Sequence, residues 1–125
     1  MGQLGFYINM MQCTGCKACE IACKDKNNLE VGTLFRKVDS FEGGKFPNVW
    51  SYSLSLACNH CENAKCMERC PTGAIYKRKN DGLVIIDKNK CIGCKMCINL
   101  CPYDHPQYIE DEGKCGKRGL NWLAK

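Results

Sequence analysis

Twelve of the 13 cysteines fall into three tight quartets, and no other feature constrains the fold as strongly. The first and third quartets share the spacing Cys-x2-Cys-x2-Cys-x3-Cys, whereas the middle gap of the second has four residues. A protein with 13 cysteines in 125 residues is expected to be built around disulfides or metal. The quartets are Cys13, Cys16, Cys19 and Cys23; Cys58, Cys61, Cys66 and Cys70; and Cys91, Cys94, Cys97 and Cys101, while Cys115 stands alone.

The spacing within the quartets distinguishes between the possible kinds of crosslink. Disulfides are disfavoured because the cysteine count is odd and the first residues show no basic or apolar region of a signal peptide. Zinc sites also use Cys-x2-Cys, but in two separated pairs, so three short gaps in a row leave thiolates that one tetrahedral ion cannot bind. Two such gaps instead wrap three sulfurs around one iron-sulfur cube, and the fourth cysteine points toward a second cube. We therefore expect [4Fe-4S] clusters that exchange their fourth ligands.

The residues around the cysteines predict the local conformation of these loops. Gly15 and Gly93 lie inside Cys-x2-Cys loops, where a missing Cβ permits a positive φ and a close approach of the backbone to a cluster. Pro71 and Pro102 follow the second and third quartets and are expected to end a helix there. His60 is interpreted as a loop histidine that donates to a sulfide or faces water.

The charge and the apolar pattern exclude several function classes. The formal charge is +5, but two clusters at roughly −2 each would reduce it to about +1, so no nucleic-acid partner is predicted. No apolar run approaches the roughly 18 residues of a membrane span. No Ser/His/Asp or paired-carboxylate constellation is present, so no catalytic residue is predicted.

The regions between the quartets predict a small α+β fold. Alternating apolar residues predict a strand over 6–11, and the cysteine spacing predicts a helix over 16–27 in which Glu20 and Lys24 form a solvent-facing pair. A hairpin is expected around Asn80-Asp81-Gly82, with strands over 74–79 and 83–87, and a further strand over 51–57. The fold class is thus a bacterial ferredoxin-like unit for two [4Fe-4S] clusters with an N-terminal strand-helix cluster arm.

At this point the motifs resemble those of a known family, the iron-sulfur electron-transfer subunits of dimethyl sulfoxide reductase and its relatives. The resemblance covers residues 5–115 and includes the order of the motifs and the wider gap in the second quartet. The motifs read CTGCKACEIACKD from residue 13, CNHC from 58, CPTGA from 70, CIGC from 91 and CPY from 101.

The resemblance implies a function, partners and ligand sets. Family members relay electrons through [4Fe-4S] clusters between a quinol-oxidising membrane anchor subunit and a molybdopterin catalytic subunit, so this chain would be membrane-associated through its partners. Carried over by position, one cluster takes Cys58, Cys61, Cys66 and Cys101, and its neighbour takes Cys91, Cys94, Cys97 and Cys70. In the first quartet, Cys13, Cys16 and Cys19 would hold a third cluster, and Cys23 would serve the partner site formed with a fourth motif.

The chain departs from the family in that fourth motif. Cys115 stands at its opening as a candidate ligand, but Arg118 replaces the second cysteine. Truncation of a longer subunit and a naturally short protein both remain open, as do a [4Fe-4S] and a [3Fe-4S] cluster on the first quartet. The predicted divisions are 1–28, the first cluster-binding arm; 29–50, an irregular insert; 51–110, the two-cluster unit; and 111–125, the incomplete fourth motif and tail.

Three other functions compete with an electron-transfer subunit. These are a stand-alone ferredoxin, a structural or regulatory module held together by zinc or a labile cluster, and a non-functional fragment. Visible absorption distinguishes an iron-sulfur protein from an all-zinc module.

Overall fold

The computed structural model describes residues 2–110 and 113–116. It divides into two compact units. One spans Phe6–Leu56, and the other joins the residues before Phe6 to the chain from Ala57 onward. The first quartet lies in the former unit, and the other nine cysteines lie in the latter.

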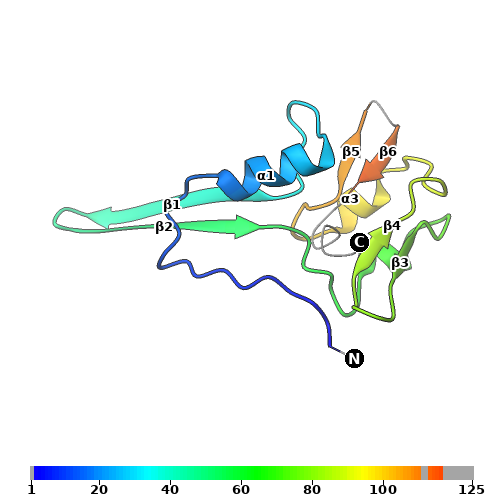
Figure 1. The fold of residues 1–125 in the computed structure, drawn as a ribbon, viewed down its shortest axis with the longest axis horizontal. Helices are drawn as coiled ribbons and strands as arrows, with labels where there is room; N and C mark the ends of the chain where they lie inside the picture. The colour runs from blue at the N-terminus through cyan, green and yellow to red at the C-terminus, as the bar shows by residue number, and fades with distance from the viewer. Residues whose placement is uncertain (1, 111–112, 117–125) are drawn as a thin grey trace. The chain divides into compact units, whose positions relative to one another are not determined.

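The unit from Phe6 to Leu56 consists of one helix and one long hairpin. Helix α1 (Ala18–Asn27) lies along the antiparallel strands β1 (Lys37–Lys45) and β2 (Asn48–Leu56), as Figure 1 shows. The helix ends at Asn27 as predicted, with Asn28 in the left-handed conformation.

The prediction of an irregular insert over 29–50 is wrong from Lys37 onward, because β1 and β2 pair without interruption. Gly43 and Gly44 lie within the predicted irregular insert, yet both belong to β1. Trp50 is the cross-strand partner of Gly43, and a Cβ on Gly43 would come within 2.6 Å of the indole. The glycine therefore makes room for a large aromatic partner, which the sequence pattern of one strand alone does not reveal.

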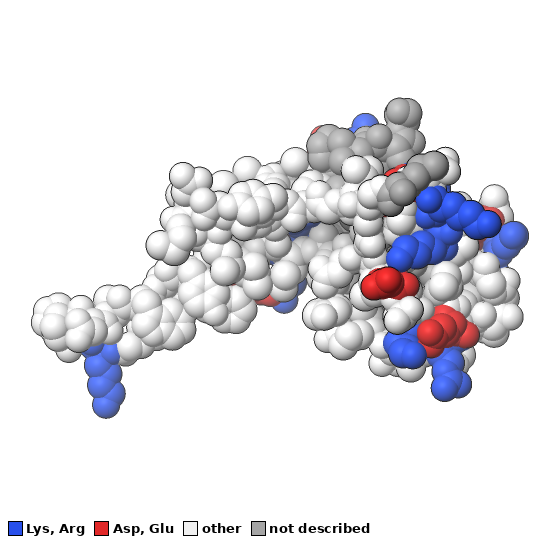
Figure 2. All heavy atoms as spheres, turned by 90° about the horizontal axis from the view of Figure 1, so that it is seen from below, with Lys and Arg blue, Asp and Glu red and all other residues white. Residues whose placement is uncertain are grey.

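The two faces of this hairpin have the reverse of the usual polarity. Ser53 and Ser55 are buried, on the face where the backbone N–H of Val38 donates to Glu20 of α1. On the opposite face, Phe41 stacks on its partner Tyr52 with ring centroids 5.3 Å apart. Trp50 stacks on Tyr52 at 5.6 Å, and all three rings are substantially exposed. Strand β2 carries no charged residue, and the hairpin is largely uncharged on the side seen in Figure 2.

Two further predictions in this unit are wrong. Glu20 does not face solvent: it is 7% exposed, and its carboxylate accepts the Val38 N–H at 2.8 Å. Lys24 instead donates to the Glu30 carbonyl at 2.9 Å. Residues 6–11 form no strand in the described structure, because the Asn9 side chain accepts the Met11 N–H in a local turn.

The unit that begins at Ala57 contains small hairpins and short helices around a shared core. Its predicted hairpin is confirmed, with shorter strands β3 (Ile75–Lys77) and β4 (Val84–Ile86) and a positive φ of 69° at Gly82. Helices α2 (Lys65–Glu68) and α3 (Met96–Leu100) both end before the prolines, as expected. A second hairpin, β5 (Gln107–Ile109) with β6 (Lys114–Gly116), was not predicted.

Cysteines form part of the core of this unit. The buried cluster consists of Ala64, Ile75, Val84, Cys97 and Cys115. Since two of its five members are thiols, ordinary apolar side chains supply only a small core. Among the described residues, no helix has the length and apolar character needed to cross a membrane.

Candidate iron-sulfur site

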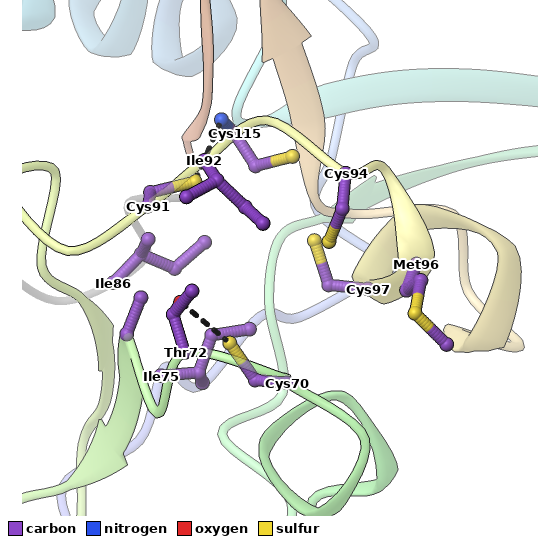
Figure 3. A pocket seen from close by; sticks show the side chains of 11 residues that line it. Cys70, Thr72, Ile75, Ile86, Cys91, Ile92, Cys94, Met96, Cys97 and Cys115 are labelled. Carbon is purple, nitrogen blue, oxygen red and sulfur yellow. Dashed lines mark hydrogen bonds between the residues drawn. The ribbon is translucent and has the colours of Figure 1, made fainter.

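Five thiols line one pocket in the unit that begins at Ala57. They come from three segments of the chain. Cys70 follows α2, and Cys115 lies on β6. The third segment is α3 with the loop before it, which carries Cys97 in the helix and Cys91 and Cys94 in the loop. Figure 3 shows these sulfurs distributed around the walls of the pocket rather than gathered at one point. The cysteine from the second quartet thus shares a pocket with three from the third.

The rest of the pocket wall is mostly apolar. Ile75, Ile86, Ile92 and Met96 contribute to it, with Thr72 near Cys70. Thiolate donors in an apolar wall suit iron-sulfur ligation, in which sulfur is the ligand and low polarity limits the access of water.

The loop at Gly93 meets the predicted requirement for glycine. Its φ is 71°, and an added Cβ would collide with the Gly113 carbonyl and come within 3.1 Å of the Tyr108 ring. Only glycine therefore lets this loop adopt the observed backbone beside the β5–β6 hairpin.

No three Cys, His, Asp or Glu side chains within the described residues converge closely enough to hold a single metal ion. Each thiolate of a four-iron cube binds a different iron, so a cluster needs sulfurs spread around a cavity. The donor set of the pocket fits such a group. Cys58, Cys61, Cys66 and Cys101 do not line this pocket, and their shared cluster stays a prediction.

The protonation of the pocket thiols differs with their surroundings. Burial, supported by the neighbouring Cys115 thiol, raises the pKa of Cys97 to about 12. Burial also raises the pKa of Cys115. Around Cys70 burial acts in the same direction, but the Thr72 hydroxyl, 3.7 Å away, and nearby backbone N–H groups outweigh it and lower the pKa. Binding iron requires deprotonated thiols, so loading this pocket must release protons.

Cys115, which opens the incomplete fourth motif in the sequence, lies beside Cys91 of the third quartet. It is 2% exposed, pairs with Tyr108 across the β5–β6 hairpin, and its backbone N–H donates to Cys91 Sγ at 3.4 Å. Figure 3 draws this hydrogen bond. No sequence signal indicated this contact, because it depends on a hairpin that was not predicted.

Cys13 and Cys16 of the first quartet lie in the loop before α1, and Cys19 and Cys23 lie within α1. Cys16 is exposed, and the Ala18 backbone N–H and the Thr14 hydroxyl lower the pKa of its thiol. Cys23 is half-buried, and burial raises the pKa of its thiol against the opposing charge of Arg36. Cys19 Sγ lies 3.3 Å from Ser55 Oγ.

Gly15 in this loop also has the predicted positive φ, 68°. A Cβ there would come within 2.6 Å of Ser53 Oγ, so the loop packs closely against the serines of the hairpin. Sequence reasoning missed Ser53, Ser55 and Arg36. The alternation of serine at 51, 53 and 55 was the one signal that could have indicated a polar inner face.

His60 has a structural position in this unit. It is 2% exposed and its Nδ1 accepts the Val84 N–H at 3.0 Å, so the prediction of a water-facing side chain is wrong, while donation to a cluster sulfide stays a prediction. The cause is β4, whose first N–H needs an acceptor that only the folded chain supplies.

Comparisons with known proteins agree with this site. A family described as a 4Fe-4S dicluster domain matches residues 49–119, and one described as a 4Fe-4S binding domain matches residues 11–28. The chain is 45% identical over 123 residues to one chain of the anaerobic dimethyl sulfoxide reductase of Escherichia coli, covering 92% of this sequence and 60% of that protein. It is 42% identical over 118 residues to a subunit of the sulfite dehydrogenase of Allochromatium vinosum, covering 82% and 49%.

A third relative is the arsenate respiratory reductase iron-sulfur subunit of a Shewanella species, 42% identical over 101 residues, with coverage of 81% and 43%. The chain therefore spans about 60% or less of the length of these curated relatives. The resemblance seen in the cysteine motifs is confirmed, and the cofactors are [4Fe-4S] clusters. The protein belongs to the 4Fe-4S dicluster domain family.

Proposed function

We propose that the chain transfers electrons through [4Fe-4S] clusters as the iron-sulfur subunit of an oxidoreductase complex. The observation that carries the proposal is the pocket in which Cys70 of the second quartet lies with Cys91, Cys94 and Cys97 of the third. Exchange of fourth ligands between two motifs is the arrangement of two-cluster ferredoxins. The complementary set, Cys58, Cys61 and Cys66 with Cys101, then holds the second cluster of this unit.

The clusters supply one-electron chemistry, and the protein's own residues bind them and adjust their surroundings. Cys115 donates its backbone N–H to Cys91 Sγ, which stabilises negative charge on that sulfur. Ile75 is buried beside the pocket and limits the access of water. The substrate site belongs to a partner, because the sequence contains no constellation suited to acid-base or nucleophilic catalysis.

The partners follow from the relatives, whose names make each of them one component of a reductase or a dehydrogenase. We infer a molybdopterin catalytic subunit on one side of the relay and a quinol-oxidising membrane anchor on the other. The chain is then associated with the membrane through that anchor subunit.

The test of the relay is metal content and reversible reduction. Anaerobically purified protein should contain about eight iron and eight sulfide for the two clusters of the unit from Ala57, and more if the first quartet is loaded. Reduction with dithionite should produce a paramagnetic signal that reoxidation removes. Stoichiometric zinc in place of iron would contradict the proposal.

Three variants test the ligand exchange. Cys94→Ser and Cys61→Ser each remove a ligand of one cluster and define its paramagnetic signal by the change. Cys70→Ser should reproduce the change seen in Cys94→Ser, although Cys70 belongs to the same quartet as Cys61. A Cys70→Ser spectrum that matches Cys61→Ser instead would show that each quartet keeps its own fourth ligand.

A further inference from the structure

Arg36 is a buried cation in the unit from Phe6 to Leu56. It is 8% exposed, and its guanidinium carbon lies 4.4 Å from the centroid of the Phe6 ring. None of the ion pairs among the described residues includes Arg36. Burying a guanidinium costs free energy unless an anion compensates its charge. No carboxylate of the described residues forms an ion pair with Arg36, so we expect another negative group near it.

One thiol of the first quartet, Cys19, lies one hydroxyl away from this cation in the same unit. Thiolates are therefore candidates for the missing anion. A four-thiolate cube carries roughly −2 when oxidised and one more negative charge when reduced, which makes it a suitable counter-charge.

Ser55 connects Arg36 to this thiol. Arg36 Nη1 lies 2.9 Å from Ser55 Oγ, and Ser55 Oγ lies 3.3 Å from Cys19 Sγ. A guanidinium can only donate, so the Ser55 oxygen accepts from Arg36. A cluster-bound Cys19 thiolate carries no hydrogen, so in the loaded protein the Ser55 hydroxyl is the donor to that sulfur. The neighbouring cation makes the Ser55 hydroxyl a stronger hydrogen-bond donor to this sulfur.

The same face of the hairpin continues this polar lining. Ser40 and Ser53 lie 2.9 Å apart, and both are close to where a Cβ on Gly15 would stand. The hydroxyls of Ser53 and Ser55 are buried while the rings of Phe41 and Tyr52 remain exposed. Burial of hydroxyls against apolar side chains would cost free energy. It is favourable where the buried neighbour is anionic sulfur.

We propose that Arg36 and Ser55 are positioning residues for a cluster on the first quartet, with Arg36 as its buried counter-charge and Ser55 as the hydrogen-bond donor to Cys19. They stabilise the more negative, reduced state and so raise the reduction potential of this cluster. This inference rests on the proposed function, because it assumes that the chain carries redox-active clusters.

Matched variants separate charge and hydrogen bonding from general destabilisation. Arg36→Met removes the buried charge, and Lys37→Met removes the adjacent, exposed one. Ser55→Ala removes the donor, Ser55→Thr restores a hydroxyl, and Ser51→Ala removes an exposed serine from the same strand.

The measurement is a redox titration of the anaerobic full-length chain followed by electron paramagnetic resonance. The signal lost in Cys16→Ser identifies the first-quartet cluster. At a fixed ambient potential, Ser55→Ala should lower the reduced-to-oxidised ratio of this cluster about tenfold, which corresponds to a midpoint about 59 mV lower for one electron. Arg36→Met should lower the ratio at least as much, whereas Ser55→Thr, Ser51→Ala and Lys37→Met should match the wild type.

Iron content serves as the second readout, since Arg36→Met protein that fails to retain the first cluster cannot be titrated. It should then lose only the iron that Cys16→Ser also loses, and Lys37→Met should lose none. Unchanged potentials and iron content in both Ser55→Ala and Arg36→Met would overturn the inference while leaving the electron-transfer function intact. Equal iron contents in the wild type and in Cys16→Ser would overturn the inference as well. Wild-type protein that contains no iron would instead overturn the proposed function.

Discussion

Glu20 joins α1 to the β1–β2 hairpin by a hydrogen bond, and its removal tests the packing of the unit from Phe6 to Leu56. The Glu20 carboxylate is 7% exposed and accepts the Val38 N–H at 2.8 Å. Val38 is buried, so Glu20→Ala leaves its N–H without this acceptor in a place that water does not reach. A hydrogen bond to a charged group contributes about 1.5–3 kcal/mol.

This free energy converts into a measurable opening of the unit. A loss of about 1.5–3 kcal/mol increases the population of the open state roughly 10- to 150-fold. Arg36 is buried and adjoins β1, so trypsin cuts after it only when the unit opens. When opening and closing are fast relative to cleavage, the cleavage rate follows the open population.

The assay is therefore anaerobic digestion of the loaded chain with trypsin, with mass spectrometry used to quantify the peptide that ends at Arg36. Asp25→Ala is the matched control, because Asp25 is an exposed acidic residue of the same helix and its loss should change stability by less than about 0.5 kcal/mol. Glu20→Gln keeps a neutral acceptor and should fall between the two. Equal cleavage rates in Glu20→Ala and Asp25→Ala would refute the reasoning.

Two further outcomes are expected. Gly93→Ala should lose iron from the unit that begins at Ala57, because the added Cβ would collide with the Gly113 carbonyl. Gly73→Ala is the control, since Gly73 has a similar φ of 61° but no atom within 4 Å of an added Cβ. Equal iron contents in the two variants would contradict this prediction. Iron chelation should abolish the cooperative thermal transition in circular dichroism, because thiols make up much of a small core, and a retained transition would argue against cluster-dependent folding.

Local chemistry made several features predictable from the sequence. The end of α1 at Asn27, the positive φ at Gly15 and Gly93 and the turn at Gly82 each depend on a residue and its immediate neighbours. The association of Cys70 with the third quartet followed from the family resemblance, and the pocket supports it, since the turn after α2 carries this thiol away from its own quartet.

Features that depend on contacts between distant segments were missed. Glu20 was assigned to the solvent from its i,i+4 partner, whereas its true partner lies 18 residues away in β1. Gly43 was assigned to an irregular insert, whereas the residue that explains a glycine there, Trp50, lies on the opposite strand. Periodicity within one segment cannot report an acceptor or an aromatic ring supplied by another.

The first and third quartets have the same cysteine spacing, so their ligands alone cannot give their clusters different properties. Their surroundings differ: the third quartet has a neutral backbone donor, the Cys115 N–H, on Cys91, whereas the first has a hydroxyl backed by the Arg36 guanidinium on Cys19. Net charge and hydrogen bonds to sulfur are among the factors that set the potentials of such clusters. Under the proposed function, two copies of one ligand motif therefore acquire different potentials from residues outside the motif.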